Sequence, residues 1–115
     1  MPRDFRDSLR DIIKCIEKIE SYVEGMEEED LRKDSKIQDA IIRNLEIIGE
    51  AVKNIPGKFR ENNPSVPWKE MAGLRDILIH NYFGVDLDIL IDIVFNELPE
   101  VKSAMTQIMV RQGDE

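Results

Sequence analysis

The 115-residue sequence predicts an all-α protein: an up-down bundle of four to five helices, expected to dimerise and to form one domain over residues 1–115. Apolar residues recur at spacings of three and four along most of the chain, which is the period of an amphipathic helix. No segment shows the period-two alternation of a half-buried strand. Charged residues make up 35% of the chain and aromatic residues 6%, which favours helices with solvated outer faces over a β-sandwich.

The first helix is expected from Asp4 to about Met26, because its apolar residues follow the helical period and charged residues fill the other face. Gly25 is expected to mark its end. The acidic run at residues 27–30 is interpreted as a solvated turn that leads into the next helix, rather than as a cation site.

The second helix has a start signal, since Ser35 and Gln38 fit the capping-box pattern, with Ser35 as the cap and Gln38 reaching back. Its apolar stripe continues to Ile55, where a Pro-Gly pair stops the helix. Gly49 lies inside this helix, where glycine costs about 1 kcal/mol relative to alanine. The sequence therefore indicates that another helix crosses closely at Gly49.

The second half of the chain is expected to hold a loop and two further helical segments. Residues 56–67 form the loop, with one short helical turn inside it. Pro67 suits the first position of a third main helix, and Trp68 is expected to anchor the core. The last segment begins after Asp86, and Pro99 within it either kinks the helix or begins a new one.

Charge and cysteine content restrict the function classes. The net charge of −8 argues against generic nucleic-acid binding, which needs clustered Lys and Arg. Only residues 36–75 carry a basic excess, with 7 basic and 5 acidic side chains, and this stretch leads into Arg75. Cys15 is alone, so no intrachain disulfide is possible and a reducing cytoplasm is expected. No apolar run is long enough to span a membrane, and no metal or other cofactor is expected.

The most informative stretch is residues 73–83, which contains His80, the only histidine of the chain. Histidine is the side chain whose unperturbed pKa lies nearest neutrality. Arg75 precedes it by five residues and Tyr82 follows by two. On a helical projection, the apolar residues of the stretch face the core while Asp76 and His80 point away from it. One interpretation is a site for acid–base chemistry, and the other is a helix end whose histidine bonds a carbonyl.

Two further features concern how such a site is assembled. Arg75 and His80 lie about 140° apart on one helix, so a two-fold dimer is the simplest way to bring such side chains into one cleft. Arg43 and Glu50 lie seven residues apart on one face of the second helix. They either belong to a surface ion-pair network that includes Glu46, or they line a cleft.

At these residues the chain resembles the HEPN superfamily, and specifically the HepT-like toxins of type VII toxin–antitoxin pairs. The family motif is an arginine, four to six residues, a histidine, and a tyrosine two positions further on. In this sequence the motif is Arg75-Asp76-Ile77-Leu78-Ile79-His80-Asn81-Tyr82, with Asp76 where the family often has asparagine. The segments at residues 45–51, 67–75 and 98–99 also resemble the family, so the resemblance covers nearly the whole chain.

The resemblance implies a metal-independent ribonuclease whose composite cleft lies at a homodimer interface. Arg75 would hold the scissile phosphate, and His80 would act as general acid or base on the RNA substrate. Asp76, Tyr82, Glu50 and Arg43 would support the site. The implied partner is a minimal nucleotidyltransferase antitoxin that attaches AMP to Tyr82.

An alternative interpretation is a non-catalytic helical module that docks on a nucleotidyltransferase and positions its substrate, and the acidic net charge favours this alternative. The two interpretations differ in surface charge. A ribonuclease needs cations near its cleft, and the candidates are Arg43, Lys53, Lys58, Arg60 and Lys69.

Overall fold

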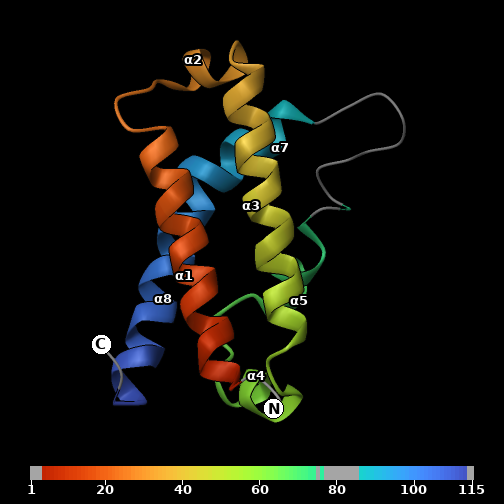
Figure 1. Cartoon of the computed structure of the whole chain (residues 1–115), viewed down its shortest axis with the longest axis vertical. Helices are drawn as coiled ribbons and strands as arrows, with labels where there is room; N and C mark the ends of the chain where they lie inside the picture. The colour runs from red at the N-terminus through yellow and green to blue at the C-terminus, as the bar shows by residue number, and fades with distance from the viewer. Residues whose placement is uncertain (1–3, 75, 77–85, 114–115) are drawn as a thin grey trace.

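A computed structural model describes residues 4–74, 76 and 86–113, and the described residues contain helices and no strand (Figure 1). Three helices are long: α1 (Phe5–Tyr22), α3 (Ser35–Lys53) and α8 (Leu98–Arg111). In Figure 1, α1 runs antiparallel to both α3 and α8. The predicted all-α, up-down bundle is therefore confirmed.

The shorter elements connect the long helices. Between α1 and α3 lies α2 (Glu28–Arg32), and α4 (Gly57–Asn62) and α5 (Trp68–Ala72) follow α3. The segment before α8 consists of α7 (Leu87–Asp92) and a π-helical stretch, Ile93–Glu97. Within the described part of the chain, no helix is both long and apolar enough to cross a membrane.

The core lies between the three long helices and is made of their apolar stripes. Aliphatic side chains at helical spacing on α1 and α3 are completely buried, and α7 and α8 complete the core from the other side. Such burial stabilises the fold by roughly 1.5–3 kcal/mol per large side chain. The fully buried residues are Leu9, Ile12, Ile16, Leu31, Ile41, Leu45, Ile48, Val52, Leu90, Met105 and Ile108.

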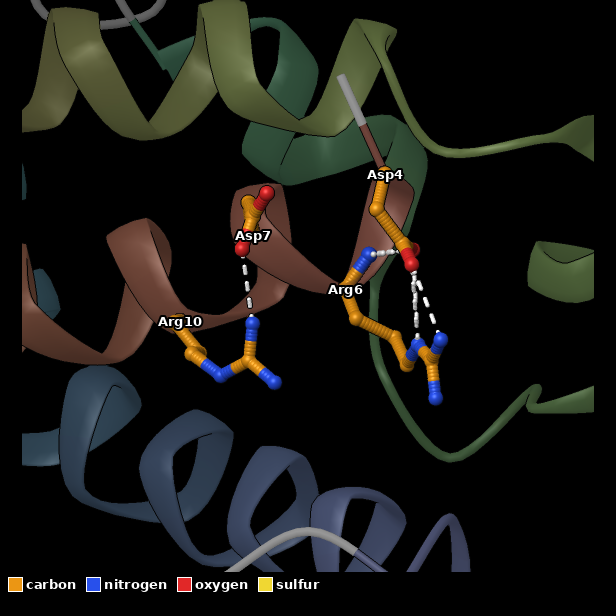
Figure 2. A network of polar contacts seen from close by, with 4 residues as sticks. All are labelled: Asp4, Arg6, Asp7 and Arg10. Carbon is orange, nitrogen blue, oxygen red and sulfur yellow. Dashed lines mark hydrogen bonds and ion pairs between the residues drawn. The ribbon is translucent and has the colours of Figure 1, made fainter.

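The start of α1 is held by local polar contacts (Figure 2). The Asp4 carboxylate caps the helix by accepting from the Arg6 backbone N–H at 2.9 Å, and it also pairs with the Arg6 guanidinium at 2.9 Å. Arg10 donates to Asp7 at 2.7 Å one turn further on. These groups are exposed and screened by water, so each pair stabilises the fold only weakly. The boundary with α8 carries a further pair, in which Lys102 Nζ lies 2.9 Å from Glu20 Oε1.

Trp68 and Gly49 behave as their sequence context predicts. Trp68 is 6% exposed, and its indole N–H donates to the Asn63 carbonyl oxygen at 3.0 Å. At Gly49, an added Cβ would lie 3.3 Å from the Ala72 carbonyl oxygen, so the predicted close crossing is the contact between α3 and α5.

The predicted capping box at Ser35 is wrong. The cap of α3 is Asp34, whose Oδ1 accepts from the Ile37 backbone N–H at 3.1 Å. Gln38 does not reach back to Ser35, because its side-chain amide donates to the carbonyl oxygens of Leu31 and Arg32 at 2.8 and 3.1 Å. Gln38 of α3 therefore caps the C-terminal end of α2. Its hydrogen bonds join two helices instead of stabilising the start of its own helix.

Three helix boundaries also differ from the prediction. The acidic run is exposed as expected, but it begins α2 rather than forming a turn, and the Asp30 carboxylate accepts from the Glu27 N–H at 2.8 Å. Helix α1 ends at Tyr22, and Gly25 lies in the following turn with φ +78°. Pro67 caps α5 instead of starting it, while Pro99 lies in the first turn of a new helix, the second of its two alternatives.

Candidate functional site

A hollow of about 340 Å³ lies on α3, next to the end of α5. It combines charged residues of α3 with Ala72, the last residue of α5, and Asp76, which follows that helix. Its lining is Arg43, Leu45, Glu46, Ile47, Gly49, Glu50, Lys53, Ala72 and Asp76.

The helical period explains why the charged residues of the hollow share one face. Arg43, Glu46, Glu50 and Lys53 fall within an arc of about 80° when α3 is projected at 100° per residue. The fully buried residues of α3 lie on roughly the opposite side of the helix and face the core. Lys53 lies ten residues after Arg43, so the charged face extends about 15 Å along the helix axis.

The structure brings together three of the six predicted site residues. Arg43, Glu50 and Asp76 line the same hollow, and the Asp76 side chain is exposed. Arg75, His80 and Tyr82 lie outside the described residues, so their catalytic and modification roles stay predictions. Asp76 is the second residue of the predicted motif. The hollow therefore adjoins the motif at the one motif residue that the structure describes.

The predicted ion-pair network on α3 takes a different form. Glu50 pairs with Lys53, with 3.3 Å between Oε1 and Nζ, rather than with Arg43. Both partners are well exposed, at 75% and 61% of their side-chain surface, so a negatively charged ligand can compete for Lys53 at little cost. Arg43 and Glu50 both line the hollow, and their role in a functional site stays a prediction.

The candidate cations divide into two groups. Arg43 and Lys53 line the hollow, whereas Lys58, Arg60 and Lys69 are absent from its lining. Glu46, Glu50 and Asp76 contribute three carboxylates, so the described lining carries a formal charge of −1. On its own this lining is a weak anion site, and binding of a phosphate there needs a further cation. Arg75, adjacent to Asp76 in the sequence, is the nearest candidate along the chain.

Two lining residues have positions that are not evident from the sequence. The helical spacing predicts Glu46 as part of an ion-pair network, and in the structure Glu46 lines the hollow together with Arg43 and Glu50. Ala72 contributes backbone beside Gly49, and the only sequence signal for this contact was a glycine inside a helix. Among residues 4–74, 76 and 86–113, no three His, Cys, Asp or Glu side chains are arranged to hold a metal ion.

Comparison with known proteins places the chain in a family. The family model described as "Ribonuclease HepT-like" matches residues 12–108. A protein of Thermococcus cleftensis named "Probable ribonuclease HepT" is 46% identical, over 94% of this chain and 98% of its own length. A protein of Caldanaerobacter subterraneus named "Putative RNase" is 44% identical, over 93% of this chain and 96% of its own length.

A third relative is longer than this chain. It is a Methanocaldococcus jannaschii protein whose name combines γ-glutamylcyclotransferase with an RNase, and it is 45% identical over 95% of this chain. The chain spans 49% of that relative's length. No solved structure matches the chain. The resemblance seen in the Arg75–Tyr82 motif is confirmed by the family match, and the chain belongs to the Ribonuclease HepT-like family.

Proposed function

We propose that this chain is a metal-independent endoribonuclease, the toxin of a toxin–antitoxin pair, with Arg75 and His80 as its catalytic residues. The family match over residues 12–108 is the observation that carries this proposal. The relatives named as ribonucleases, which align over more than nine-tenths of the chain, support the same substrate class. The hollow beside Asp76 supplies a surface on which RNA can lie next to the motif.

The proposed chemistry is attack of a ribose 2′-hydroxyl on the adjacent phosphorus. A neutral His80 accepts the 2′-hydroxyl proton, while the Arg75 guanidinium binds the phosphate oxygens and stabilises the charge that develops on them. The bond from phosphorus to the 5′-oxygen then breaks, and a protonated histidine donates a proton to that oxygen. The products are a 2′,3′-cyclic phosphate and a 5′-hydroxyl end.

A homodimer would supply both the base and the acid that this reaction needs. Each chain has one histidine, yet the reaction uses one base and one acid. A two-fold axis beside the motif brings two copies of His80 and two of Arg75 into one cleft. Arg43 and Lys53 would then contact phosphates on either side of the scissile bond, and Asp76 would hold the imidazole of His80 by a hydrogen bond.

Regulation is proposed to act on Tyr82. In this reaction the Tyr82 oxygen attacks the α-phosphorus of ATP on a minimal nucleotidyltransferase, and pyrophosphate leaves. The product carries a nucleotide and an added negative charge two residues from His80. Both the bulk and the charge would oppose binding of an RNA backbone at the site.

The test is RNA cleavage by the purified chain in the presence of EDTA. Because general acid–base catalysis contributes about 10²- to 10⁴-fold, His80→Ala is expected to lower kcat by at least about 100-fold, and Arg75→Ala by a similar amount. Lys58→Ala is the matched control, since Lys58 is exposed and outside the lining of the hollow. Unchanged cleavage by either motif variant would contradict the proposal.

The same test distinguishes the proposed ribonuclease from the alternative, a non-catalytic module that binds a nucleotidyltransferase. The net charge of −8 and the three carboxylates of the hollow favour a module that binds a nucleotidyltransferase without cutting RNA. That module predicts a stable complex with a nucleotidyltransferase, and no cleavage by wild-type protein.

A further inference from the structure

Gly49 lies where α3 comes closest to the end of α5. A Cβ atom on Gly49 would lie 3.3 Å from the carbonyl oxygen of Ala72 and 3.4 Å from that of Met71. The shorter distance is tighter than nine in ten real Cβ contacts. Both neighbours are backbone atoms, so they cannot rotate away as the end of a flexible side chain would.

The two carbonyls belong to the last two residues of α5, the helix that precedes the proposed catalytic motif in the chain. Ala72 and Asp76 line the same hollow as Gly49, and Leu74 between them is buried, at 7% exposure. Described residues on both sides of position 75 in the sequence, Ala72 and Asp76, therefore line the hollow on α3. The contact at Gly49 lies at the start of this segment.

We propose that Gly49 is a positioning residue for the ribonuclease site, an inference that rests on the proposed function. Because Gly49 has no side chain, α3 contacts the backbone of residues 71–72 directly. This contact sets the point from which the chain enters the Arg75–His80 motif. Rates respond strongly to such placement, since a misplacement of about 1 Å can cost about 100-fold.

Substitution of Gly49 separates positioning from a role in stability alone. Alanine is a better helix former than glycine, so Gly49→Ala adds helix stability while its Cβ pushes on the α5 carbonyls. Because these effects oppose each other, we expect a Tm within about 5 °C of wild type. The displacement needed is a few tenths of an ångström, so we expect kcat to fall by about tenfold. KM should change little, because Arg43 and Lys53, the proposed phosphate contacts of the hollow, are unaltered.

Two other glycines provide matched controls. Among the residues that the structure describes, none would lie within 4 Å of a Cβ on Gly57, in the first turn of α4. Of the same described residues, a Cβ on Gly73 would meet only ordinary contacts, 3.7 and 3.9 Å from the carbonyl oxygens of Lys69 and Glu70. Gly57→Ala and Gly73→Ala should therefore keep the wild-type kcat. Each full-length variant is assayed for RNA cleavage well below its own Tm, and kcat and KM are measured separately.

A folded Gly49→Ala variant with reduced kcat, unchanged KM and two active control variants would support the inference. Wild-type kcat in Gly49→Ala, a change confined to KM, or an equal loss in the controls would overturn it. A variant that fails to fold would also overturn it, because the contact would then serve stability alone. Wild-type protein and His80→Ala are run in parallel. If wild type does not cut RNA, or His80→Ala still does, the proposed function itself has failed.

Discussion

Neutralising the two cations of the hollow should weaken the salt dependence of RNA binding. Arg43 and Lys53 line the hollow about 15 Å apart along α3, so they can contact different phosphates of one strand. Each phosphate contact to a single strand contributes about 0.7 to the slope of log affinity against log salt. Two contacts therefore contribute about 1.4, so over a fourfold rise in salt the wild-type Kd should increase about sevenfold more than that of a variant lacking both.

The measurement is fluorescence anisotropy of a labelled single-stranded RNA, with all proteins carrying His80→Ala so that the RNA stays intact. The test variant adds Arg43→Gln and Lys53→Gln. The control adds Lys18→Gln and Lys58→Gln, which remove the same charge from exposed positions outside the lining of the hollow. If both variants lose the same slope, the effect is one of net charge, and the assignment of the hollow as an RNA surface is refuted.

Three further predictions concern the fold. Trp68→Phe removes the indole N–H that donates to the Asn63 carbonyl at 3.0 Å, and urea denaturation should show a loss of about 1–3 kcal/mol; an unchanged midpoint would contradict this. Partial burial, followed by the charge of Asp92, raises the pKa of Glu97 above 4.5. The folded state then holds this proton more tightly than the unfolded state, so stability is lost as pH rises through the folded pKa. The Tm advantage of Glu97→Gln should accordingly be largest at neutral pH and shrink toward pH 4, and a difference that is independent of pH would refute this account. Cys15 is 6% exposed and burial raises the pKa of its thiol, so iodoacetamide should label it quickly only in denaturant, and rapid labelling of native protein would show that α1 opens readily.

The long helices were predictable because their apolar residues repeat over four or more turns. The same period predicted that Arg43 and Glu50 share one face of α3, and the glycine inside that helix predicted a close crossing. The position of Asp76 beside this face was not derivable from period alone, since it depends on how α5 packs against α3. The sequence thus predicts which site residues share a face of one helix, but not how residues of different helices are placed relative to one another.

The errors occurred where contacts between elements override local patterns. Ser35 and Asp34 are adjacent, and both are good capping residues. Asp34 caps α3 because its carboxylate reaches the Ile37 N–H, while Gln38 is occupied by the carbonyls at the end of α2. Helix α2 itself has one buried residue, Leu31, so it has no apolar period to detect. The π-helical stretch before α8 is not distinguishable from an α-helix in the sequence, because Leu90, Ile91, Val94 and Leu98 keep the α-helical spacing through it.

The chemical identity of the cleaved ends tests the central claim most directly. A synthetic RNA is incubated with wild-type protein in EDTA, and the masses of the fragments are measured by mass spectrometry. A second substrate with a 2′-deoxy nucleotide at the cut position is treated in the same way. We expect fragments ending in a 2′,3′-cyclic phosphate, no cut at the deoxy position, and no product with His80→Ala. Fragments ending in a 3′-hydroxyl, or cleavage of the deoxy substrate, would contradict attack by the 2′-hydroxyl and with it the proposed role of His80.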